Sequence, residues 1–291
     1  MSRVLAIDIG GTNIRAGLAD IARPHEVEMV ATGAAPSDLL DFRTCVNGLI
    51  ETYRPDRIGI AIPGLANGTL CRWVPNLPYL DGTDVADLFP QQPMALGNDA
   101  QMALVAEATA GAAAGFSDAI LIAIGTGIGS AVLSGGRVLR GSRGGATSFG
   151  WASADPTDRG DDRDGWLERH ASGRALDRLA CAAGLKDGTA LIAAARTGDA
   201  DSLARLGGPA SALAACLAGA IALLDPAVVL ITGGVASAFD VLAPLTLTAL
   251  TRQLPPHLRS IRLAVGHFGP GAVIAGAAIT AAGSPLWESQ S

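Results

Sequence analysis

The chain of 291 residues carries a formal net charge of −6, with 49% hydrophobic and 16% charged residues. A chain of this size and apolar content buries roughly three-quarters of its unfolded surface, which excludes global disorder. The acidic balance and the absence of a basic run argue against DNA or RNA as a partner, so no nucleic acid is expected.

Lysine is almost missing from the chain, because Lys186 is the only lysine among the 21 Lys and Arg residues. It follows Leu185, whereas a P-loop needs Gly-Lys-Ser or Gly-Lys-Thr to hold phosphates. The chain is therefore not a P-loop NTPase. The polar stretch around Lys186 is predicted to lie at a helix end.

Cysteine and histidine are scarce and scattered, at four residues each. The cysteines form neither a Cys-x-x-Cys pair nor a cluster with histidine; they are Cys45, Cys71, Cys181 and Cys216. This spacing argues against a disulfide framework and predicts a cytoplasmic protein. We recognise no signal peptide. The longest apolar stretch, 210–224, is broken by Gly219 and falls short of the ~20 residues of a membrane span, so no membrane is expected.

Short apolar runs alternate with stretches of helical composition, which is the pattern of an α/β protein. In the first part of the chain we predict strands at 4–9, 14–18, 26–32, 57–62 and 94–96, helices at 38–53 and 100–114, and a loop-rich region at 65–92. In the later part we predict helices at 166–183, 202–224, 239–253 and 270–282, and strands at 227–232 and 261–265.

The opening strand, glycine turn and strand recur further along the chain. A predicted strand at 119–124 leads into the turn 125–129 and a second strand at 130–134. Gly10 of the first turn and Gly125 of the second lie 115 positions apart. We interpret the repeat as an internal duplication into two domains, with the ligand site in the cleft between them.

The first turn, Asp8-Ile9-Gly10-Gly11-Thr12-Asn13, has the composition of a phosphate-binding hairpin. Glycines let the backbone approach an anion, and turn N–H groups can point at it. Asp8 at the strand end could hold Mg²⁺ directly or through water. The alternative is a plain tight hairpin, because Gly-Gly turns are common.

The second turn, Gly125-Thr126-Gly127-Ile128-Gly129, resembles a dinucleotide fingerprint only superficially. That fingerprint must open a helix, whereas a β-like run and another Gly-Gly turn follow here. A phosphate-binding hairpin therefore fits better than a Rossmann motif. Gly233-Gly234, between a predicted strand and helix, could border a nucleotide but is weak evidence alone.

Asn98-Asp99 lies between a predicted strand end and a helix start. Taken alone, the pair would be a helix N-cap, because Asn and Asp satisfy the first free N–H groups of a helix. Together with two phosphate loops, Asp99 instead becomes a candidate general base for a hydroxyl that attacks a phosphate.

These motifs together resemble the ROK family of sugar kinases and regulators, within the superfamily of actin, Hsp70 and hexokinase. The resemblance spans nearly the whole chain and rests on the order of the segments 8–13, 58–64, 98–99, 125–129, 165–168, 171–173 and 233–234. It implies an α/β fold of two duplicated ribonuclease H-like domains with an ATP and sugar cleft between them. The smaller domain would comprise residues 1–98 and the C-terminal helix 270–285, and the larger one residues 99–269.

The resemblance also implies a role for each motif, with ATP and Mg²⁺ as cofactors. Asp8 would help to organise Mg²⁺, directly or through water, and Asp99 would be the general base. The ATP-binding residues would be Asp8, Gly10, Gly11, Thr12, Asn13, Gly125, Thr126, Gly127, Gly233 and Gly234. The sugar-binding residues would be Pro63, Gly64, Asn98, Asp99, Ser148, Trp151 and Glu168.

The chain departs from the family pattern after the second phosphate loop. Where the family usually has Gly-Glu-Ile-Gly-His, this chain has Thr147-Ser148-Phe149-Gly150-Trp151, and residues 159–166 lack the zinc cysteines. No zinc is therefore expected. A serine can still hydrogen-bond, and a tryptophan face can pack on the C–H surface of a sugar. Alternatively, Trp151 fills the volume left by the lost zinc site.

Two functions from different classes follow from these observations. The first is ATP-dependent phosphorylation of a hexose or related small carbohydrate. The alternative is a sugar-sensing regulatory protein with little or no catalysis, because the usual Glu and His are replaced. The intact Asp99 and glycine loops favour the kinase, as does the predicted phosphate-binding strand near residue 3, where the family's repressors carry a helix-turn-helix. The acceptor sugar stays open, and family analogy allows a homodimer.

Overall fold

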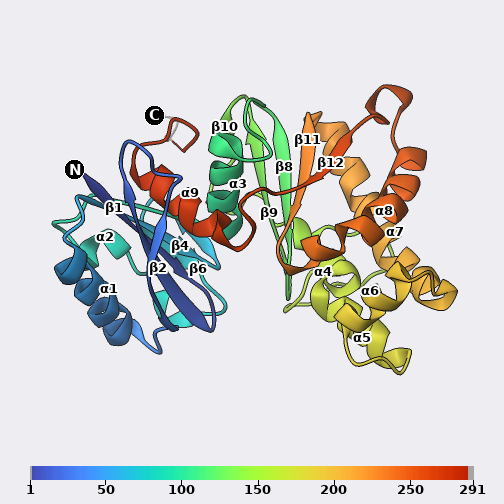
Figure 1. The fold of residues 1–291 in the computed structure, drawn as a ribbon, viewed down its shortest axis with the longest axis horizontal. Helices are drawn as coiled ribbons and strands as arrows, with labels where there is room; N and C mark the ends of the chain where they lie inside the picture. Colours follow the sequence, from blue (N-terminus) through green and yellow to red (C-terminus); the bar gives the residue numbers. More distant parts are fainter. Residues whose placement is uncertain (1, 288–291) are drawn as a thin grey trace. The chain divides into compact units, whose positions relative to one another are not determined.

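The computed structural model describes residues 2–287, and internal contacts divide the chain into two units. The first unit comprises Met1–Gly115, Ala131–Thr147 and His267–Ser291, and the second comprises Phe116–Ser130 and Ser148–Gly266. The chain builds two five-stranded sheets with helices packed on them (Figure 1). The predicted α/β class with two sheet-based domains is confirmed.

The two sheets repeat one strand order. The first runs β3-β2-β1-β4-β7 and the second β10-β9-β8-β11-β12. In each sheet, the strand before the glycine turn is the central one, β1 in the first and β8 in the second. On one side it pairs in parallel with the next strand of the sheet, β4 in the first and β11 in the second. This equivalence supports the predicted duplication.

The strands of the first sheet are β1 (Arg3–Ile9), β2 (Asn13–Asp20), β3 (Glu28–Ala34), β4 (Arg57–Ile62) and β7 (Met94–Asn98). The strands of the second sheet are β8 (Ala119–Ile124), β9 (Ile128–Ser134), β10 (Arg137–Val138), β11 (Val228–Thr232) and β12 (Arg262–Val265). A separate hairpin is formed by β5 (Leu65–Asn67) and β6 (Leu70–Trp73).

The α-helices are α1 (Leu39–Tyr53), α2 (Val85–Leu88), α3 (Asp99–Ala110), α4 (Trp166–Ala171), α5 (Gly173–Ala182), α6 (Gly188–Arg196), α7 (Ala200–Leu224), α8 (Phe239–Gln253) and α9 (Ala272–Ala281). Single 3₁₀ turns occur at η1 (Pro78–Leu80), η2 (Phe149–Trp151), η3 (Gly234–Ala238), η4 (Pro256–Leu258) and η5 (Gly269–Gly271).

Strand β1 is buried on both faces, and its alternating side chains build two cores. Leu5, Ile7 and Ile9 join a cluster with Phe42 and Val46 of α1. The opposite face contributes to a cluster with α9, formed by Val4, Ala6, Ala61, Met102, Ile274, Ala277 and Ala278. Period-two alternation of this kind places α1 and α9 on opposite faces of the first sheet (Figure 1).

Helix α9 approaches its neighbours so closely that glycine is required at the contacts. A Cβ atom on Gly276 would lie 1.7 Å from the Met102 carbonyl oxygen of α3. A Cβ on Gly59 of β4 would lie 2.1 Å from the Ala277 carbonyl oxygen. Small residues along α9 therefore set how near this helix, α3 and the first sheet can pack.

Glu107 of α3 anchors the segment that leads into α9. Its side chain is fully buried and accepts hydrogen bonds from the backbone N–H groups of Ala112, His267 and Phe268 at 2.8, 2.9 and 2.9 Å. Residues 107 and 267 are far apart in sequence, so this carboxylate joins two distant segments of the first unit.

The division into units differs from the predicted domain boundary after Asn98. Contacts assign α3 and residues 131–147 to the first unit, because α3 packs on α9. The predicted C-terminal helix lies in the first unit, as α9.

Several predicted elements differ in detail from those in the structure. The region 65–92, predicted as loop-rich, contains the β5–β6 hairpin and α2, and the predicted helix 100–114 ends at Ala110. The single helix predicted at 166–183 is two helices. Ser172 separates them, and its Oγ accepts from the backbone N–H of Ala175 at 3.3 Å to cap α5. Helix α6 was not predicted.

Helix α7 is longer than expected from residues 202–224, at 25 residues, and continues through Pro209. By length and composition, α7 and the stretch 234–253 could each cross a bilayer. In the most apolar window of α7, 56% of the residues are buried within the structure, and Leu206 and Leu213 lie in its interior. Packing in a protein core accounts for that apolar face.

Replacing Glu107 tests its anchoring role. We expect Glu107→Ala to lower the free energy of unfolding by about 3 kcal/mol, because three backbone N–H groups lose the buried carboxylate that accepts from them. Glu107→Gln keeps one acceptor oxygen and should cost less. The midpoint of urea unfolding measures both. The exposed Glu51→Ala of α1 is the control, expected within about 0.5 kcal/mol of the wild type. Equal midpoints for Glu107→Ala and Glu51→Ala would show that Glu107 anchors nothing.

Candidate active site

The first glycine turn joins β1 to β2 and is open at its tip. The Gly10 N–H donates to the Asn13 carbonyl at 2.8 Å and closes the turn. Gly11, Thr12 and Asn13 are exposed. A side chain on Gly11 would meet the Asn76 Cβ at 3.1 Å, so the backbone is accessible on one side and supported on the other. The geometry suits a backbone cradle for an anion.

Asp8 lies at the end of β1 and is largely buried, at 9% exposed. The antiparallel register places it directly opposite Arg15 on β2. Arg15 Nε donates to Asp8 Oδ2 at 3.1 Å, and Nη2 also contacts that oxygen. Nη1 of Arg15 donates to the Pro270 carbonyl at 3.0 Å. The predicted Mg²⁺ residue is therefore held in an ion pair that the sequence argument missed.

Asn98, the last residue of β7, caps helix α3. Its Oδ1 accepts from the N–H groups of Ala100 and Gln101 at 2.9 and 3.4 Å. Its Nδ2 donates to the Gly64 carbonyl at 3.1 Å. The capping interpretation of this residue is confirmed, and the same side chain ties α3 to the predicted Pro63-Gly64 turn after β4.

Asp99 is the first residue of α3 and is partly buried. Burial and, to a smaller extent, the nearby charge of Asp8 raise the pKa of Asp99 to about 6, against the lowering effect of a hydrogen bond from the Ala100 N–H at 2.7 Å. A carboxylate of this pKa is ionised at neutral pH and yet basic enough to accept a proton.

A second contact fixes α3 near its N-terminus. Gln101 is buried, and its Nε2 donates to the Ala146 carbonyl at 2.8 Å. The segment that carries Ala146 also lies close to β5, since a Cβ on Gly144 would sit 1.9 Å from the Ala66 carbonyl oxygen. Gln101 thus holds the segment just before residues 147–151, where the sequence departs from the usual family pattern.

In the second unit, the glycine turn between β8 and β9 is closed by the Gly125 N–H, which donates to the Gly127 carbonyl at 2.9 Å. The Gly173 N–H, at the start of α5, donates to the Gly125 carbonyl at 2.8 Å. Thr126 is exposed, and a Cβ on Gly125 would meet open space. The N-terminus of α5 therefore lies against this turn, where its dipole favours an anion.

Gly233 follows β11 with a φ of +82°, and its position requires glycine because a Cβ would lie 2.5 Å from the Ile124 carbonyl oxygen. Ile124 is the residue before Gly125. Gly233 and Gly234 are both exposed. The predicted adenosine-binding glycines therefore lie beside the predicted phosphate loop of the same unit.

Glu168 of α4 also borders that loop. A Cβ on Gly127 would sit 2.5 Å from Glu168 Oε1, so the carboxylate lies directly on the backbone of the turn. Oε1 accepts from Arg174 Nη2 at 2.7 Å, and the same nitrogen donates to Asp164 at 2.7 Å. Arg174 was not predicted, and it fixes the orientation of the Glu168 side chain.

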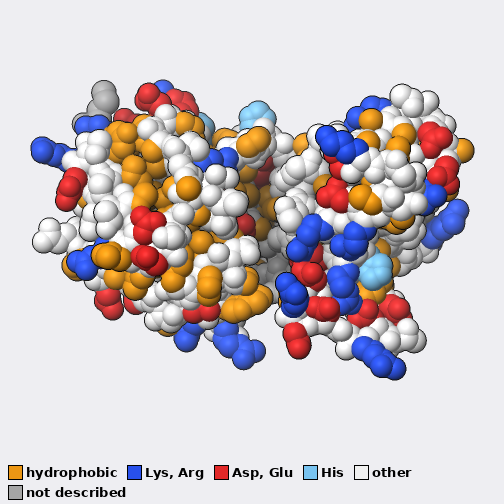
Figure 2. All heavy atoms as spheres, turned by 90° about the horizontal axis from the view of Figure 1, so that it is seen from below, with side chains coloured by type: hydrophobic (Ala, Val, Ile, Leu, Met, Phe, Trp, Pro, Cys, Tyr) orange, Lys and Arg blue, Asp and Glu red, His pale blue; other side chains and the backbone are white. Residues whose placement is uncertain are grey.

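The segment before α4 is held by further ion pairs. Arg169 donates to both carboxylate oxygens of Asp158 at 2.6 and 2.8 Å. Charged side chains of both signs lie interspersed on the face seen in Figure 2.

Over residues 2–287, no group of three His, Cys, Asp or Glu side chains could hold a metal ion. The absence of zinc stays a prediction.

Ser148 and Trp151 lie at the start and end of the η2 turn. The Trp151 N–H donates to the Ser148 carbonyl at 3.0 Å, and Ser148 is exposed. Trp151 is 42% exposed, so part of its ring is open to solvent and part is covered, and both interpretations of this residue stay predictions. The exposed part of the indole is available to contact a ligand.

The structure thus gathers the predicted residues into two sets, each within one unit. The first-unit set is Asp8, Gly10, Gly11, Thr12, Asn13, Pro63, Gly64, Asn98 and Asp99. The second-unit set is Gly125, Thr126, Gly127, Ser148, Trp151, Glu168, Gly233 and Gly234. The missed Arg15 had a usable signal, because a tight turn at 10–13 pairs residue 8 with residue 15.

Comparison with known proteins gives consistent results. The model of the ROK family matches residues 4–283. The bifunctional enzyme NanE/NanK of Brucella melitensis is 34% identical over 81% of this chain and 46% of its own length. The chain therefore spans about half the length of the curated relatives it first matches.

Two further relatives are matched over nearly their full length. The N-acetylmannosamine kinase of Shigella flexneri is 30% identical, covering 97% of this chain and 99% of that protein. The crystal structure of a ROK family glucokinase from Streptomyces griseus, in complex with glucose and AMPPNP, superposes with a TM-score of 0.78 at 26% identity, covering 96% and 99% of the two chains. With a family model that matches almost the whole chain and a fold shared with a solved member, this protein belongs to the ROK family.

Proposed function

We propose that the chain is a kinase that transfers the γ-phosphoryl group of ATP to a hydroxyl of a hexose or related small carbohydrate. The observation that carries the proposal is Asp99, a partly buried carboxylate with a pKa raised to about 6, at the start of a helix in the same unit as an open glycine turn. The kinases named among the relatives support the same reaction class.

Asp99 accepts the proton of the attacking sugar hydroxyl, most simply the primary one. The hydroxyl oxygen forms a bond to the γ-phosphorus as the bond to the bridging β–γ oxygen breaks, and ADP leaves. Asn98 holds α3 against the Gly64 carbonyl and so keeps Asp99 in place. Pro63, Gly64, Ser148, Trp151 and Glu168 are proposed to bind the sugar, with the Trp151 face on its C–H surface.

The glycine turns at Gly10–Asn13 and Gly125–Gly127 are proposed to hold the phosphates of ATP through backbone N–H groups, with Gly233 and Gly234 beside the adenosine. Asp8 is the only protein carboxylate that we propose for Mg²⁺, and its Oδ2 already pairs with Arg15. Such a site fits Mg²⁺ that takes most of its ligands from phosphate and water oxygens, directly or through water at Asp8. When bound, Mg²⁺ neutralises charge on the phosphates.

A coupled ADP-release assay with ATP and Mg²⁺ across a sugar panel tests the proposal. The panel contains glucose, mannose, fructose, allose and N-acylated amino sugars such as N-acetylmannosamine. Turnover with at least one sugar is expected. For that sugar, Asp99→Asn should still bind it but lose phosphoryl transfer by about 10²–10⁴-fold, because the proton acceptor is gone.

The matched control is Asp187→Asn, at the N-cap of α6, where the Asp187 side chain accepts from the Ala190 N–H at 2.9 Å. Asn is as good a helix N-cap as Asp, so the rate of phosphoryl transfer by Asp187→Asn should stay near that of the wild type. Near-normal turnover in Asp99→Asn would refute its role as the base. Measurable sugar binding without turnover of any sugar would instead favour the sugar-sensing function.

Arg174 provides a separate test of the proposed sugar contact at Glu168. Arg174→Gln should raise the KM for the sugar about 3–10-fold with little change in kcat, because Glu168 loses the donor that orients it. Steady-state kinetics with saturating ATP measure both constants, and Arg174→Lys should recover part of the loss. Arg178→Gln, one turn further along α5 and bonded to the Arg169 carbonyl at 2.6 Å, is the control. Equal effects of Arg174→Gln and Arg178→Gln would contradict a specific role at Glu168.

A further inference from the structure

The segment 140–146 belongs to the first unit and ends two residues before Ser148, one of the proposed sugar-binding residues. The segment folds back on itself, because the Ala146 N–H donates to the Arg140 carbonyl at 3.1 Å. It also lies directly on β5, since a Cβ on Gly144 would clash with the backbone of that strand. The position of Ser148 therefore depends on how this segment is held.

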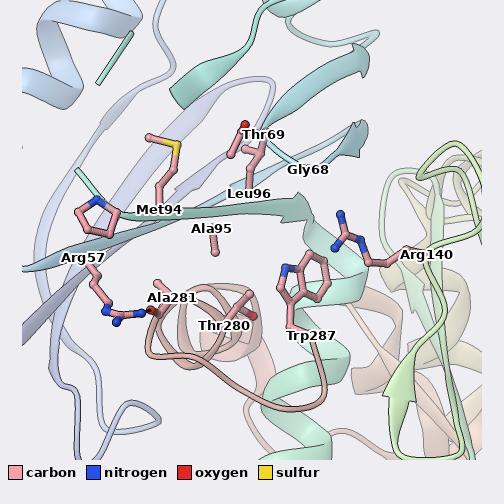
Figure 3. A pocket seen from close by; sticks show the side chains of 11 residues that line it. Arg57, Gly68, Thr69, Met94, Ala95, Leu96, Arg140, Thr280, Ala281 and Trp287 are labelled. Atoms are coloured by element: carbon pink, nitrogen blue, oxygen red, sulfur yellow. Dashed lines mark hydrogen bonds between the residues drawn. The ribbon is translucent and has the colours of Figure 1, made fainter. Parts of the chain in front are cut away.

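The start of the segment is held by the side chain of Arg140. Figure 3 shows this side chain extending toward the Trp287 ring, and the guanidinium carbon lies 4.9 Å from the ring centroid. The ring in turn packs on the backbone of β7, because a Cβ on Gly97 would lie 2.6 Å from it. These contacts fix residue 140, so a separate contact has to set the position of residue 146.

The end of the segment is held by Gln101 of α3. Its side chain is 3% exposed, and its Nε2 donates to the Ala146 carbonyl at 2.8 Å. Gln101 lies two residues after Asp99 in the first turn of the helix. On the other side of Asp99, the Asn98 side chain donates to the Gly64 carbonyl. Two side-chain amides that flank the candidate base therefore each hold a segment that carries or precedes proposed sugar contacts.

The chain is also held just after Ser148. The Phe149 N–H donates to the Oγ of Ser130, a buried residue of β9, at 3.2 Å. Ser148 thus lies between two backbone positions that are bonded to buried side chains, with Gln101 acting before it and Ser130 after it. An apolar side chain at position 101 could fill the same volume, but it would leave the Ala146 carbonyl without this donor.

We propose that Gln101 is a positioning residue for sugar binding, which acts through the Ala146 carbonyl on the position of Ser148. This role rests on the proposed function, because it takes Ser148 to be a sugar contact. Without the donor, the segment has to be ordered when the sugar binds, and that ordering lowers the affinity. Proton transfer depends on Asp99, whose helix is capped separately by Asn98. The loss should therefore appear in sugar binding and not in kcat.

Gln101→Met tests this role, because methionine favours a helix and has a similar length but has no N–H to donate. Isothermal titration with glucose, mannose, fructose, allose and N-acetylmannosamine gives the Kd of each sugar that binds, and steady-state kinetics give KM and kcat. The Kd and KM for the sugar should rise about 5–10-fold, while kcat stays within about twofold of the wild type. Gln101→Asn is too short to reach Ala146 and should weaken binding in the same direction, so it carries the test if Gln101→Met does not fold.

The matched control is Thr280→Val in α9, where the buried hydroxyl donates to Met102 Sδ of α3 at 3.3 Å. This variant removes a buried hydrogen bond to the same helix but leaves the Ala146 carbonyl bonded, so its Kd for the sugar should stay within about twofold of the wild type. The role of Gln101 is overturned if its folded variants bind the sugar as tightly as the wild type, or if Thr280→Val weakens binding equally.

The titration also separates this role from the kinase function. A wild type that binds a sugar without turning it over would contradict the kinase, whereas a Kd that still rises in Gln101→Met would support the positioning role. Turnover by the wild type with an unchanged Kd and KM in Gln101→Met would contradict the positioning role alone. A wild type that binds none of the sugars would overturn both.

Discussion

Asn98 caps α3 with its own side-chain oxygen and at the same time donates to the Gly64 carbonyl. These hydrogen bonds, one to the helix and one to the turn, set where the next residue lies. Asp99 consequently begins the helix partly buried, and burial raises the pKa of its carboxyl to about 6. A capping interaction that is usually only structural therefore prepares the candidate base.

The rest of the first unit keeps α3 at this position. Gly276 lets α9 approach the backbone of α3, and Glu107 bonds the far end of α3 to the segment before α9. Gln101 holds the Ala146 segment on the same helix. The small residues at these contacts have a physical use, because only small residues allow helices and strands to approach so closely.

Sequence patterns predicted much of this arrangement. The apolar runs and glycine turns located the principal strands, and the repeated turn indicated the duplication that the two sheets display. Ser172 was not recognised as a helix break, because its cap depends on a local side-chain bond that periodicity does not reveal. The domain boundary after Asn98 stays a prediction; contacts with α9 group α3 with the first unit, and no local sequence pattern encodes such tertiary contacts.

Sequence reasoning identified the residues of the candidate site but not their neighbours. Arg15 and Arg174 each orient a predicted carboxylate, and both depend on register or helix geometry. The exposure of Trp151 could not be foreseen either, because volume filling and ligand packing call for the same residue type.

The pH dependence of kcat/KM, measured with a sugar that turns over, tests the central claim about Asp99 most directly. If Asp99 must be ionised to accept the proton, the rate constant should be level at neutral pH and fall tenfold per pH unit below about pH 6, and this acid limb should be missing from the residual rate of Asp99→Asn. A rate constant that stays level to about pH 5, or an acid limb that persists in Asp99→Asn, would contradict the assignment of Asp99 as the base.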